Sequence, residues 1–594
     1  MRPGQDAAQG QGSNAYNQAV VPTSFSFRFS HVRRIAACVC LTIALAFSMA
    51  VCAQGQSSGD SSATTSAADR GRILLVLPFD NRTGQPSLEW IREAAPELIS
   101  SRFRSVGFEP MSRADRRYAL DHLGLPQGFH PSRASSLKLA QTLDADSIVV
   151  GSYITDGTGI VAEARLVDVP HLRMSQAVTA RGEMRNLIDV FDSLAWKLTR
   201  QLDTRTGVAE ETFIAAGKGM HLDAFEQYIR GITEPDQAER LRHLELAVKL
   251  SPDFGPALVD LGREYYNGQQ YEQAADAFAK VDKNGPDGLE AGYYRGLSLL
   301  FSGDYAKAEQ AFADVARILP LAEVVNNEAV AVSRQGHDGT GLFVQAAADD
   351  PNSADYHFNL AVSLKHHGQA PGAMNELAQC LRLRPADTEA LALQVAWKQP
   401  AAPQATAPAA PAAAAPNASP DVDAAPDPLE RIVRSFDAVA FRQAALMLDQ
   451  VDASRLATLT PLEQAQKLSA QAKGFLDRGL LLEAERLYQS AVAADSKCAE
   501  AHAGLAQVRE RTGAADAARN EAHTALKLKP SADAYLVLGR LDLASNHLSD
   551  AGNEATEALK LEPTSQAAQE LSRQVQARTG HLKRGLTTGP GVCY

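Results

Sequence analysis

The stretch that decides the fold of this chain is DFGPALVDLGREYYNGQQYEQAADAFAKVDKNGP, residues 253–286. It ends in a proline that returns at a nearly constant step along the chain. Pro252, Pro286 and Pro320 follow one another at equal steps, Pro351 and Pro385 repeat the same step, and Pro530 and Pro563 are only one position closer together. A period of about 34 residues indicates helical repeats. Because one such repeat cannot bury its own apolar face, the repeats must stack to form a core.

Other residue types recur in step with the prolines. Most repeats have a small residue in the first helix, an alanine in the second, and an aromatic residue or leucine four positions later. The recurring residues are Gly262, Ala274, Phe278, Pro286, Gly296, Ala308, Phe312, Pro320, Ala373, Pro385, Gly513, Pro530, Gly539 and Pro563. Over roughly residues 220–398 and 462–565 the chain therefore resembles the tetratricopeptide repeat family. The resemblance implies an array of helix pairs that binds other proteins, and we expect no cofactor.

Packing explains this spacing. A small residue such as Gly262 lets the two helices of a pair approach closely, and Ala274 is expected to meet it from the second helix. Phe278 is expected to fill the gap between neighbouring repeats, and Pro286 begins the turn because proline cannot continue a helix. A bulky side chain at Gly262 should overpack the pair and cost about 1–3 kcal/mol.

Residues 71–205 show a different pattern. Ile73–Leu77 is a continuous apolar run of strand length, which indicates a strand buried on both faces. Further strands are expected at residues 108–112, 147–154, 160–167 and 173–180, and helices at residues 87–105, 133–143 and 186–203. Two βα steps followed by three hairpin-linked strands predict a mixed sheet covered by helices. The predicted fold class is a multidomain chain with a mixed-sheet α/β domain, followed by an all-α solenoid in two blocks.

The α/β region also resembles a known family. The matching residues are Leu77–Asn81 after the first strand, Leu139–Asp146 before the central strand, Val149–Tyr153 and Ala164–Asp168. On these residues it is similar to the TolB amino-terminal-like domain, which is related to the CsgG and FlgO envelope proteins. The resemblance implies a binding module without an active site, in bacterial envelope proteins or beside repeat arrays.

The first residues have the pattern of a targeting segment. Residues 1–34 are polar and carry four arginines, and Ile35–Ala53 contain no charge. A basic stretch, an apolar stretch and small residues at the end indicate a secretory signal, cleaved before Gln54. Nineteen uncharged residues also reach the length of a membrane anchor, and a lipidated Cys52 is the weakest alternative. In each case we expect residues 54–594 to be exported to the periplasm or to the periplasmic face of a bacterial membrane, and we expect membrane contact only through residues 35–53 if they are not cleaved.

Composition divides the rest of the chain. Residues 54–70 form a flexible tether and residues 219–398 the first repeat block. Residues 399–428 hold eight prolines and thirteen alanines, which is typical of a linker. Residues 429–578 form the second block, in which 429–452 should be one or two poorly matched helices and 566–578 a polar capping helix. The tail at 579–594 is expected to be disordered.

The concave groove of the repeats is the candidate binding surface. The first-helix positions that line this groove in tetratricopeptide repeat proteins include two tyrosines and a phenylalanine close to arginines and a lysine. The candidates are Val259, Arg263, Tyr266, Asn267, Tyr293, Asn327, Arg334, Phe358, Lys365 and His366. Such a surface suits an extended or helical peptide. The alternative is that several of these residues simply pack between repeats.

Motifs for chemistry are sparse. The sequence contains no HExxH, Cys-x-x-Cys or Walker motif, and no GxSxG elbow between a strand and a helix. His366-His367 is the only histidine pair and is expected to be solvent-exposed without binding a metal, and Cys380 is expected to be core packing. Gly157 and Gly159 match a dinucleotide-binding spacing but lie between two strands, where a hairpin turn is expected. A disulfide between Cys498 and Cys593 remains open, since nothing in the sequence pairs them.

The sequence therefore predicts an exported, non-enzymatic scaffold for protein–protein interactions in the bacterial envelope. A net charge of −12 disfavours nucleic-acid binding, which depends on basic groups that neutralise phosphates. Two alternatives remain open. The first is an oligomeric structural part of an envelope or secretion assembly, with self-association through the α/β domain. The second is an enzyme with an unrecognised site within residues 71–205.

Overall fold

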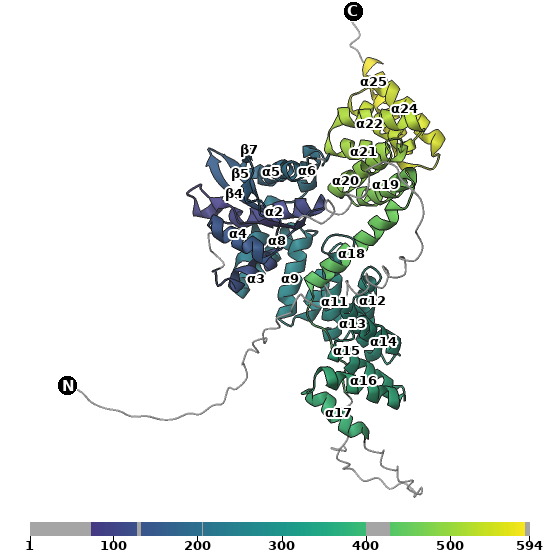
Figure 1. Ribbon diagram of the computed structural model, residues 1–594. Helices are drawn as coiled ribbons and strands as arrows, with labels where there is room; N and C mark the ends of the chain where they lie inside the picture. Colours follow the sequence, from purple (N-terminus) through teal and green to yellow (C-terminus); the bar gives the residue numbers. More distant parts are fainter. Residues whose placement is uncertain (1–72, 127–131, 205, 399–427, 588–594) are drawn as a thin grey trace, which may run out of the picture. The chain divides into compact units, whose positions relative to one another are not determined.

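The computed structural model describes residues 73–126, 132–204, 206–398 and 428–587, and Figure 1 labels most of its helices and some of its strands. The segments that we expected to be a targeting segment, a tether and most of the linker lie outside these residues. None of the helices in the four ranges combines the length and hydrophobicity needed to cross a bilayer.

The first folded region is a mixed sheet, as its sequence predicts. Its central strands follow the order β3-β1-β4-β5-β6, while β2 pairs with β4 and β7 pairs with β5. Strand β1 runs parallel to β3 and β4, and β4 runs antiparallel to β5. The strands are β1 (Ile73–Val76), β2 (Asp80–Asn81), β3 (Glu109–Pro110), β4 (Ser147–Asp156), β5 (Gly159–Asp168), β6 (Arg173–Met174) and β7 (Val178–Glu183).

Helices cover both faces of this sheet. Leu74 and Val76 of β1 pack into one cluster with residues of α2 and α5, whereas Leu75 packs into a second cluster with residues of α3 and α4. The apolar run is therefore buried on both faces. The helical elements are η1 (Pro86–Leu88), α2 (Ile91–Ser105), α3 (Arg113–His122), α4 (Arg133–Thr142), η2 (Met184–Asn186), α5 (Leu187–Leu202) and α6 (Glu210–Gly217).

Two elements differ from the sequence prediction. The single strand expected at residues 173–180 is divided into β6 and β7. At the break, the Ser175 hydroxyl accepts a hydrogen bond from the Leu166 amide and donates one to the Gln176 carbonyl. These bonds interrupt the backbone pairing with β5. Helix α3 was not expected. Its first turn is fixed by a capping box, in which Ser112 and Asp115 bind each other's backbone amides.

The remainder is all α-helical. The first block contains α7 (Leu222–Thr233), α8 (Gln237–Leu250), α9 (Gly255–Asn267), α10 (Tyr271–Ala279), α11 (Gly288–Ser302), α12 (Tyr305–Ala316), α13 (Ala322–Arg334), α14 (Thr340–Asp349), α15 (Ala354–His366), α16 (Ala370–Leu383) and α17 (Thr388–Lys398). The second contains α18 (Ala438–Ala457), α19 (Pro461–Asp477), α20 (Leu481–Ala494), α21 (Ala499–Thr512), α22 (Ala515–Leu528), α23 (Ala532–Ala544), α24 (Leu548–Leu561) and α25 (Gln566–Thr587).

The close helix packing at the repeat glycines uses an aromatic ring. A Cβ atom at Gly262 would lie 2.7 Å from the Phe278 ring, and one at Gly296 would lie 2.7 Å from the Phe312 ring. The ring four positions after the alanine therefore faces the glycine, and it is not confined to the gap between repeats. Ala274 is buried nearby in the same core.

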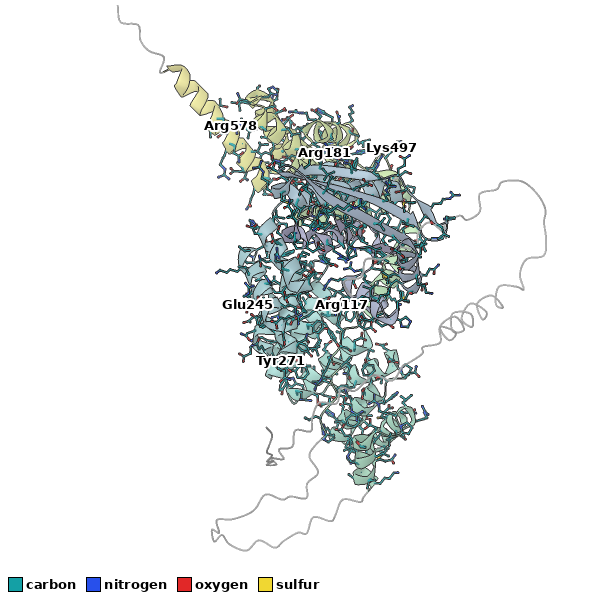
Figure 2. The ribbon with its side chains drawn as sticks, turned by 90° about the vertical axis from the view of Figure 1, so that its left-hand side faces the viewer. Arg117, Arg181, Glu245, Tyr271, Lys497 and Arg578 are labelled. Carbon is teal, nitrogen blue, oxygen red and sulfur yellow. The ribbon has the colours of Figure 1, made fainter. Side chains whose placement is uncertain are left out.

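The ends of the second block differ from our expectations. Residues 428–437 are extended and α18 begins only at Ala438, so the helices expected at 429–452 are replaced by an extended segment and one helix. Helix α25 continues beyond the expected end at 578. Arg578 donates a 2.7 Å hydrogen bond to the Leu543 carbonyl and so joins α25 to α23. Figure 2 labels Arg578, and it also labels Glu245 and Tyr271 of the first block.

Candidate peptide groove in the first helical block

An extended segment of the chain itself lies against the first block. We call residues 428–437 the resident segment. The β-branched side chains of Ile432 and Val433 favour an extended backbone. Asp437 is the N-cap of helix α18, because its carboxylate accepts a hydrogen bond from the Ala440 amide at 2.9 Å. The resident segment thus lies between the linker and the second block.

Asparagine side chains bind the backbone of this segment. Asn359 on α15 accepts a hydrogen bond from the Arg431 amide at 2.6 Å and donates to the Arg431 carbonyl at 2.8 Å. Asn327 on α13 does the same for Val433, at 3.0 Å to the amide and 2.8 Å to the carbonyl. The two bound residues are two positions apart, which matches the alternation of an extended chain. The groove therefore pairs with the segment as a neighbouring strand would.

Two further side chains complete this polar network. Asn326 donates to the Arg431 carbonyl at 3.1 Å and accepts from Asn359 at 2.8 Å. The Tyr293 hydroxyl on α11 donates to the Val433 carbonyl at 2.9 Å. The asparagines are fully buried, and their amide groups are held by neighbours as well as by the segment. A buried polar network with its hydrogen bonds satisfied fixes a single position for the bound backbone.

The side chain of Arg431 occupies a charged pocket on α15 and α17. Its guanidinium donates to Asp387 at 2.7 and 2.9 Å, to Asp355 at 2.8 Å and to Glu389 at 2.9 Å. It also lies over the Phe358 ring, 3.7 Å from the ring centre. The hydrogen bond from Arg431 lowers the pKa of Asp387. For Asp355, burial raises the pKa, but hydrogen bonds from Arg384 and Arg431 outweigh it and the net shift is downward.

The residues on either side of Arg431 are also bound. Glu430 is buried and pairs with Arg334 at 3.0 Å, and it forms a hydrogen bond with Ser333. At the other end, the Phe436 ring packs against Tyr293 and Tyr294 at centroid distances of 5.7 and 6.0 Å. The groove therefore contacts an acid, an arginine and an aromatic side chain of the segment.

The ten groove candidates divide into two sets. Tyr293, Asn327, Arg334 and Phe358 contact the resident segment. The other six have different surroundings. Val259 is buried in the core, Arg263 pairs with Asp260 and Glu290, and Tyr266 packs against Tyr271, Tyr294 and Phe301. Asn267 and His366 are exposed, and Lys365 lies over the Trp397 ring.

Sequence reasoning missed several residues that bind the segment. They are Asn326, Asn359, Ser333, Asp355, Asp387 and Glu389. One signal was present, because Asn326 and Asn359 stand close to one repeat period apart and so occupy equivalent places in successive repeats. The acids of the Arg431 pocket carry no such signal, since Asp387 and Glu389 follow the last clear repeat.

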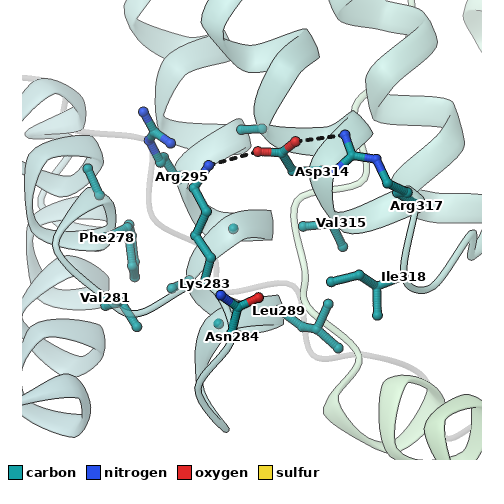
Figure 3. A pocket seen from close by; sticks show the side chains of 15 residues that line it. Phe278, Val281, Lys283, Asn284, Leu289, Arg295, Asp314, Val315, Arg317 and Ile318 are labelled. Carbon is teal, nitrogen blue, oxygen red and sulfur yellow. Dashed lines mark hydrogen bonds and ion pairs between the residues drawn. The ribbon is translucent and has the colours of Figure 1, made fainter. Parts of the chain in front are cut away.

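A second cavity lies between α10, α11 and α12, with a volume of about 250 Å³. Figure 3 shows Lys283 and Arg317 reaching Asp314 from opposite sides of it, each at 2.9 Å. A hydrogen bond from Lys283 lowers the pKa of Asp314. Lys283, Asp314 and Arg317 therefore already have partners, and the peptide groove is the stronger candidate site.

The described residues give little support for metal or thiol chemistry. Within the four ranges, no group of three or more His, Cys, Asp or Glu side chains is placed to hold a metal ion. Cys380 and Cys498 are buried free thiols, so Cys380 lies in the core as its position suggests. Cys593 lies outside the described residues, so the structure does not test the open alternative of a disulfide with Cys498.

A comparison with protein families agrees with the repeat architecture. A family model described as a tetratricopeptide repeat matches residues 259–323 and 469–533, once in each block. Similar solved structures include MamA from Desulfovibrio magneticus RS-1, which is 21% identical over 29% of this chain and 99% of that chain, with a TM-score of 0.26. YrrB, described as a TPR protein with an unusual peptide-binding site, is 16% identical over 34% of this chain and 99% of that chain, with a TM-score of 0.26. The LpoB carboxyl-terminal domain from Escherichia coli is 19% identical over 19% of this chain and 84% of that chain, with a TM-score of 0.18. No curated protein matches the chain. On the family match, both helical blocks of this chain carry tetratricopeptide repeats.

Proposed function

We propose that this chain is a non-enzymatic scaffold, which binds extended segments of other proteins in the groove of its first block and acts in the bacterial cell envelope after export. The observation that supports the binding function is the recognition of backbone groups by Asn327 and Asn359. An asparagine side chain offers one acceptor and two donors, so it can pair with the amide and carbonyl of any extended residue. The groove thus suits segments from other chains as well as its own.

The proposed location rests on two sequence features. The basic stretch and the uncharged run at residues 35–53 support export, and the likeness of residues 71–205 to the TolB amino-terminal-like domain supports an envelope role. Tetratricopeptide repeats next to such a domain suit a protein that joins envelope partners. We propose that the α/β domain binds one partner while the first block binds another.

The binding function is tested by crosslinking in cells that produce the full chain. The variant N327A/N359A removes two side chains that bind backbone, and N267A removes an exposed asparagine of α9 that does not contact the segment. We expect partner segments to be crosslinked to α13 and α15 in the wild-type chain and in N267A, and to be lost from the double variant. Equal recovery of the same crosslinks in all three chains would contradict groove binding.

Export is tested by fractionation of cells that produce the full chain or a chain lacking residues 35–53. We expect the full chain in the periplasm or on the membrane, and the shortened chain in the cytoplasm. An amino terminus at Gln54 would show cleavage, and an intact amino terminus in the membrane fraction would show an anchor. A cytoplasmic full chain would contradict the envelope role.

A further inference from the structure

The pocket around Arg431 has the chemistry of a selective arginine site. We call Asp355, Phe358, Asp387 and Glu389 the arginine pocket. Asp387 binds the guanidinium through both of its oxygens, Asp355 and Glu389 each take a further bond, and the ring of Phe358 covers its face. A planar guanidinium can satisfy all of these contacts at once, whereas the compact ammonium of lysine can neither pair with one carboxylate through two parallel bonds nor stack flat on the ring.

The pocket is held in shape by groups other than its ligand. Asp387 accepts a hydrogen bond from the Ala390 amide at 3.1 Å, so the start of α17 fixes its carboxylate. Arg384 binds Asp355 at 2.8 and 3.0 Å from the other side. Without Arg431, the three carboxylates keep only one cation, Arg384, which leaves an excess of negative charge for an incoming guanidinium. The site is therefore organised before an arginine enters it.

The resident segment fills this pocket with contacts that another chain can reproduce. Its backbone is bound by asparagine amides, which do not distinguish one extended segment from another. Its side chains are contacted at Glu430, Arg431 and Phe436, and the apolar Ile432 and Val433 pack against the core of the first block, while Leu429 is 63% exposed and contributes little. A competing segment thus needs an extended backbone and an arginine at the place of Arg431, with an acid before it and an aromatic residue five positions after it.

We propose that the groove of the first block is an arginine-reading peptide site, and that the resident segment is an internal competitor which a partner protein displaces with an extended, arginine-bearing segment of its own. This inference rests on the proposed function, because it assumes that the groove accepts segments from other chains. A covalently attached competitor is present at a high effective concentration, so an outside segment must bind more tightly than the resident one or arrive with additional contacts.

The test measures the binding of a labelled peptide to the full chain by fluorescence anisotropy. The probe is a fluorescein-labelled synthetic peptide with the sequence of residues 428–441, and a second probe has citrulline in place of the arginine at position 431. Citrulline keeps the shape of the side chain but removes its charge. The chains are the wild type, R431E, which places a carboxylate against the acids of the pocket, and L429E, which adds a carboxylate at the exposed Leu429 of the same segment. Thermal unfolding checks that the three chains fold equally well.

We expect R431E to bind the arginine probe at least about tenfold more tightly than the wild type or L429E does, because its groove is vacated. We also expect the citrulline probe to lose at least about tenfold in affinity for R431E. In R431E, the further substitution E389Q should weaken binding of the arginine probe and leave binding of the citrulline probe nearly unchanged.

Other outcomes would overturn the inference in distinguishable ways. If R431E binds both probes equally, the groove accepts peptides and the proposed function stands, but arginine reading is wrong. If all three chains bind the arginine probe equally, the resident segment is not a competitor. If no chain binds either probe, the inference and the proposed binding function both fail. If sedimentation shows a wild-type dimer that R431E abolishes, the segment of a second copy fills the groove, and internal competition is wrong.

Discussion

At the scale of single residues, one added methyl group should have opposite effects at two helical glycines. A Cβ atom at Gly262 would lie 2.7 Å from the Phe278 ring, whereas nothing lies within 4 Å of one at Gly474, inside α19. We expect G262A to lower the free energy of unfolding by about 1–3 kcal/mol through overpacking. We expect G474A to raise it by up to about 1 kcal/mol, because alanine favours a helix over glycine. Urea denaturation followed by circular dichroism measures both, and a stabilised G262A would contradict the close packing.

A buried ion pair offers a second test at this scale. Arg102 on α2 and Asp192 on α5 form hydrogen bonds of 2.7 and 3.2 Å, and both side chains are buried. Burial raises the pKa of Asp192 to about 6, although Arg102 opposes this shift. Because D192A would leave a buried guanidinium without its partner, we expect a loss of about 3–5 kcal/mol in unfolding free energy. The matched change D189A removes a less buried acid from the same helix and should cost less than about 1 kcal/mol.

Glu554 on α24 should make stability depend on pH. Burial, and then the negative charge of Asp542, raise the pKa of Glu554 to about 8. A carboxyl group whose pKa is higher in the folded state than in the unfolded state favours folding when it is protonated. The wild-type chain should therefore lose stability as the pH rises from about 4.5 to about 8, and E554Q should be less sensitive over this window.

Melting temperatures of the wild type, E554Q and E557Q at pH 5.5 and 8.5 test this expectation. Glu557 lies on the same helix, is partly exposed and pairs with Lys560, so E557Q serves as the control. The advantage of E554Q over the wild type should be larger at pH 8.5 than at pH 5.5. An equal advantage at both values would show that Glu554 does not titrate in this range.

At the scale of elements, the resident segment should exchange its amide hydrogens slowly although it is neither helix nor strand. The amides of Arg431 and Val433 donate to Asn359 and Asn327 at 2.6 and 3.0 Å, so both are protected while the segment is bound. We expect hydrogen-exchange mass spectrometry to show protection of residues 428–437 in the wild type and in N267A, and fast exchange in N327A/N359A. Fast exchange in the wild type would mean that the segment does not stay in the groove.

The same element shows where sequence reasoning stopped. The repeat period of the prolines and the glycine–aromatic pairs were sufficient to predict the stacked helices, because these features recur and each serves local packing. The apolar run at residues 73–77 likewise predicted a doubly covered sheet. The segment at 428–437 has no repeat partner, and its extended form depends on asparagines about 70 and 105 positions away. A single sequence does not indicate contacts between such distant residues.

The groove was predictable only in part for a similar reason. Repeat positions placed Tyr293, Asn327, Arg334 and Phe358 on the inner side of the array, where they contact the segment. They did not indicate which other side chains contact neighbouring residues of the repeats in place of the segment. Tyr266 packs against Tyr294, and Arg263 pairs with Glu290. The missed capping box of α3 was a different kind of error, since Ser112 and Asp115 have the spacing of a helix start in the sequence itself.

At the scale of the whole molecule, release of the resident segment should expose a cleavage point between the two blocks. Arg431 is bound by the pocket, and Arg434 follows it in the same segment. We expect trypsin to cut after these arginines at least about tenfold faster in N327A/N359A than in the wild type or N267A, because a bound segment must leave the groove before it can enter the protease. The products would end at Arg431 or Arg434 and begin at Ile432 or Ser435. Equal rates in the three chains would show that the segment is already free in the wild type.

The place of the resident segment along the chain has a mechanical consequence. Its ten residues, held in the groove, do not contribute to the reach of the connection between the two blocks. An extended chain advances about 3.3 Å per residue, so their departure would add about 33 Å of contour length to that connection. Capture of a ligand by the first array would thus lengthen the covalent connection to the second array, which would still be joined to α6 through the hydrogen bond between the Ala209 amide and Glu485.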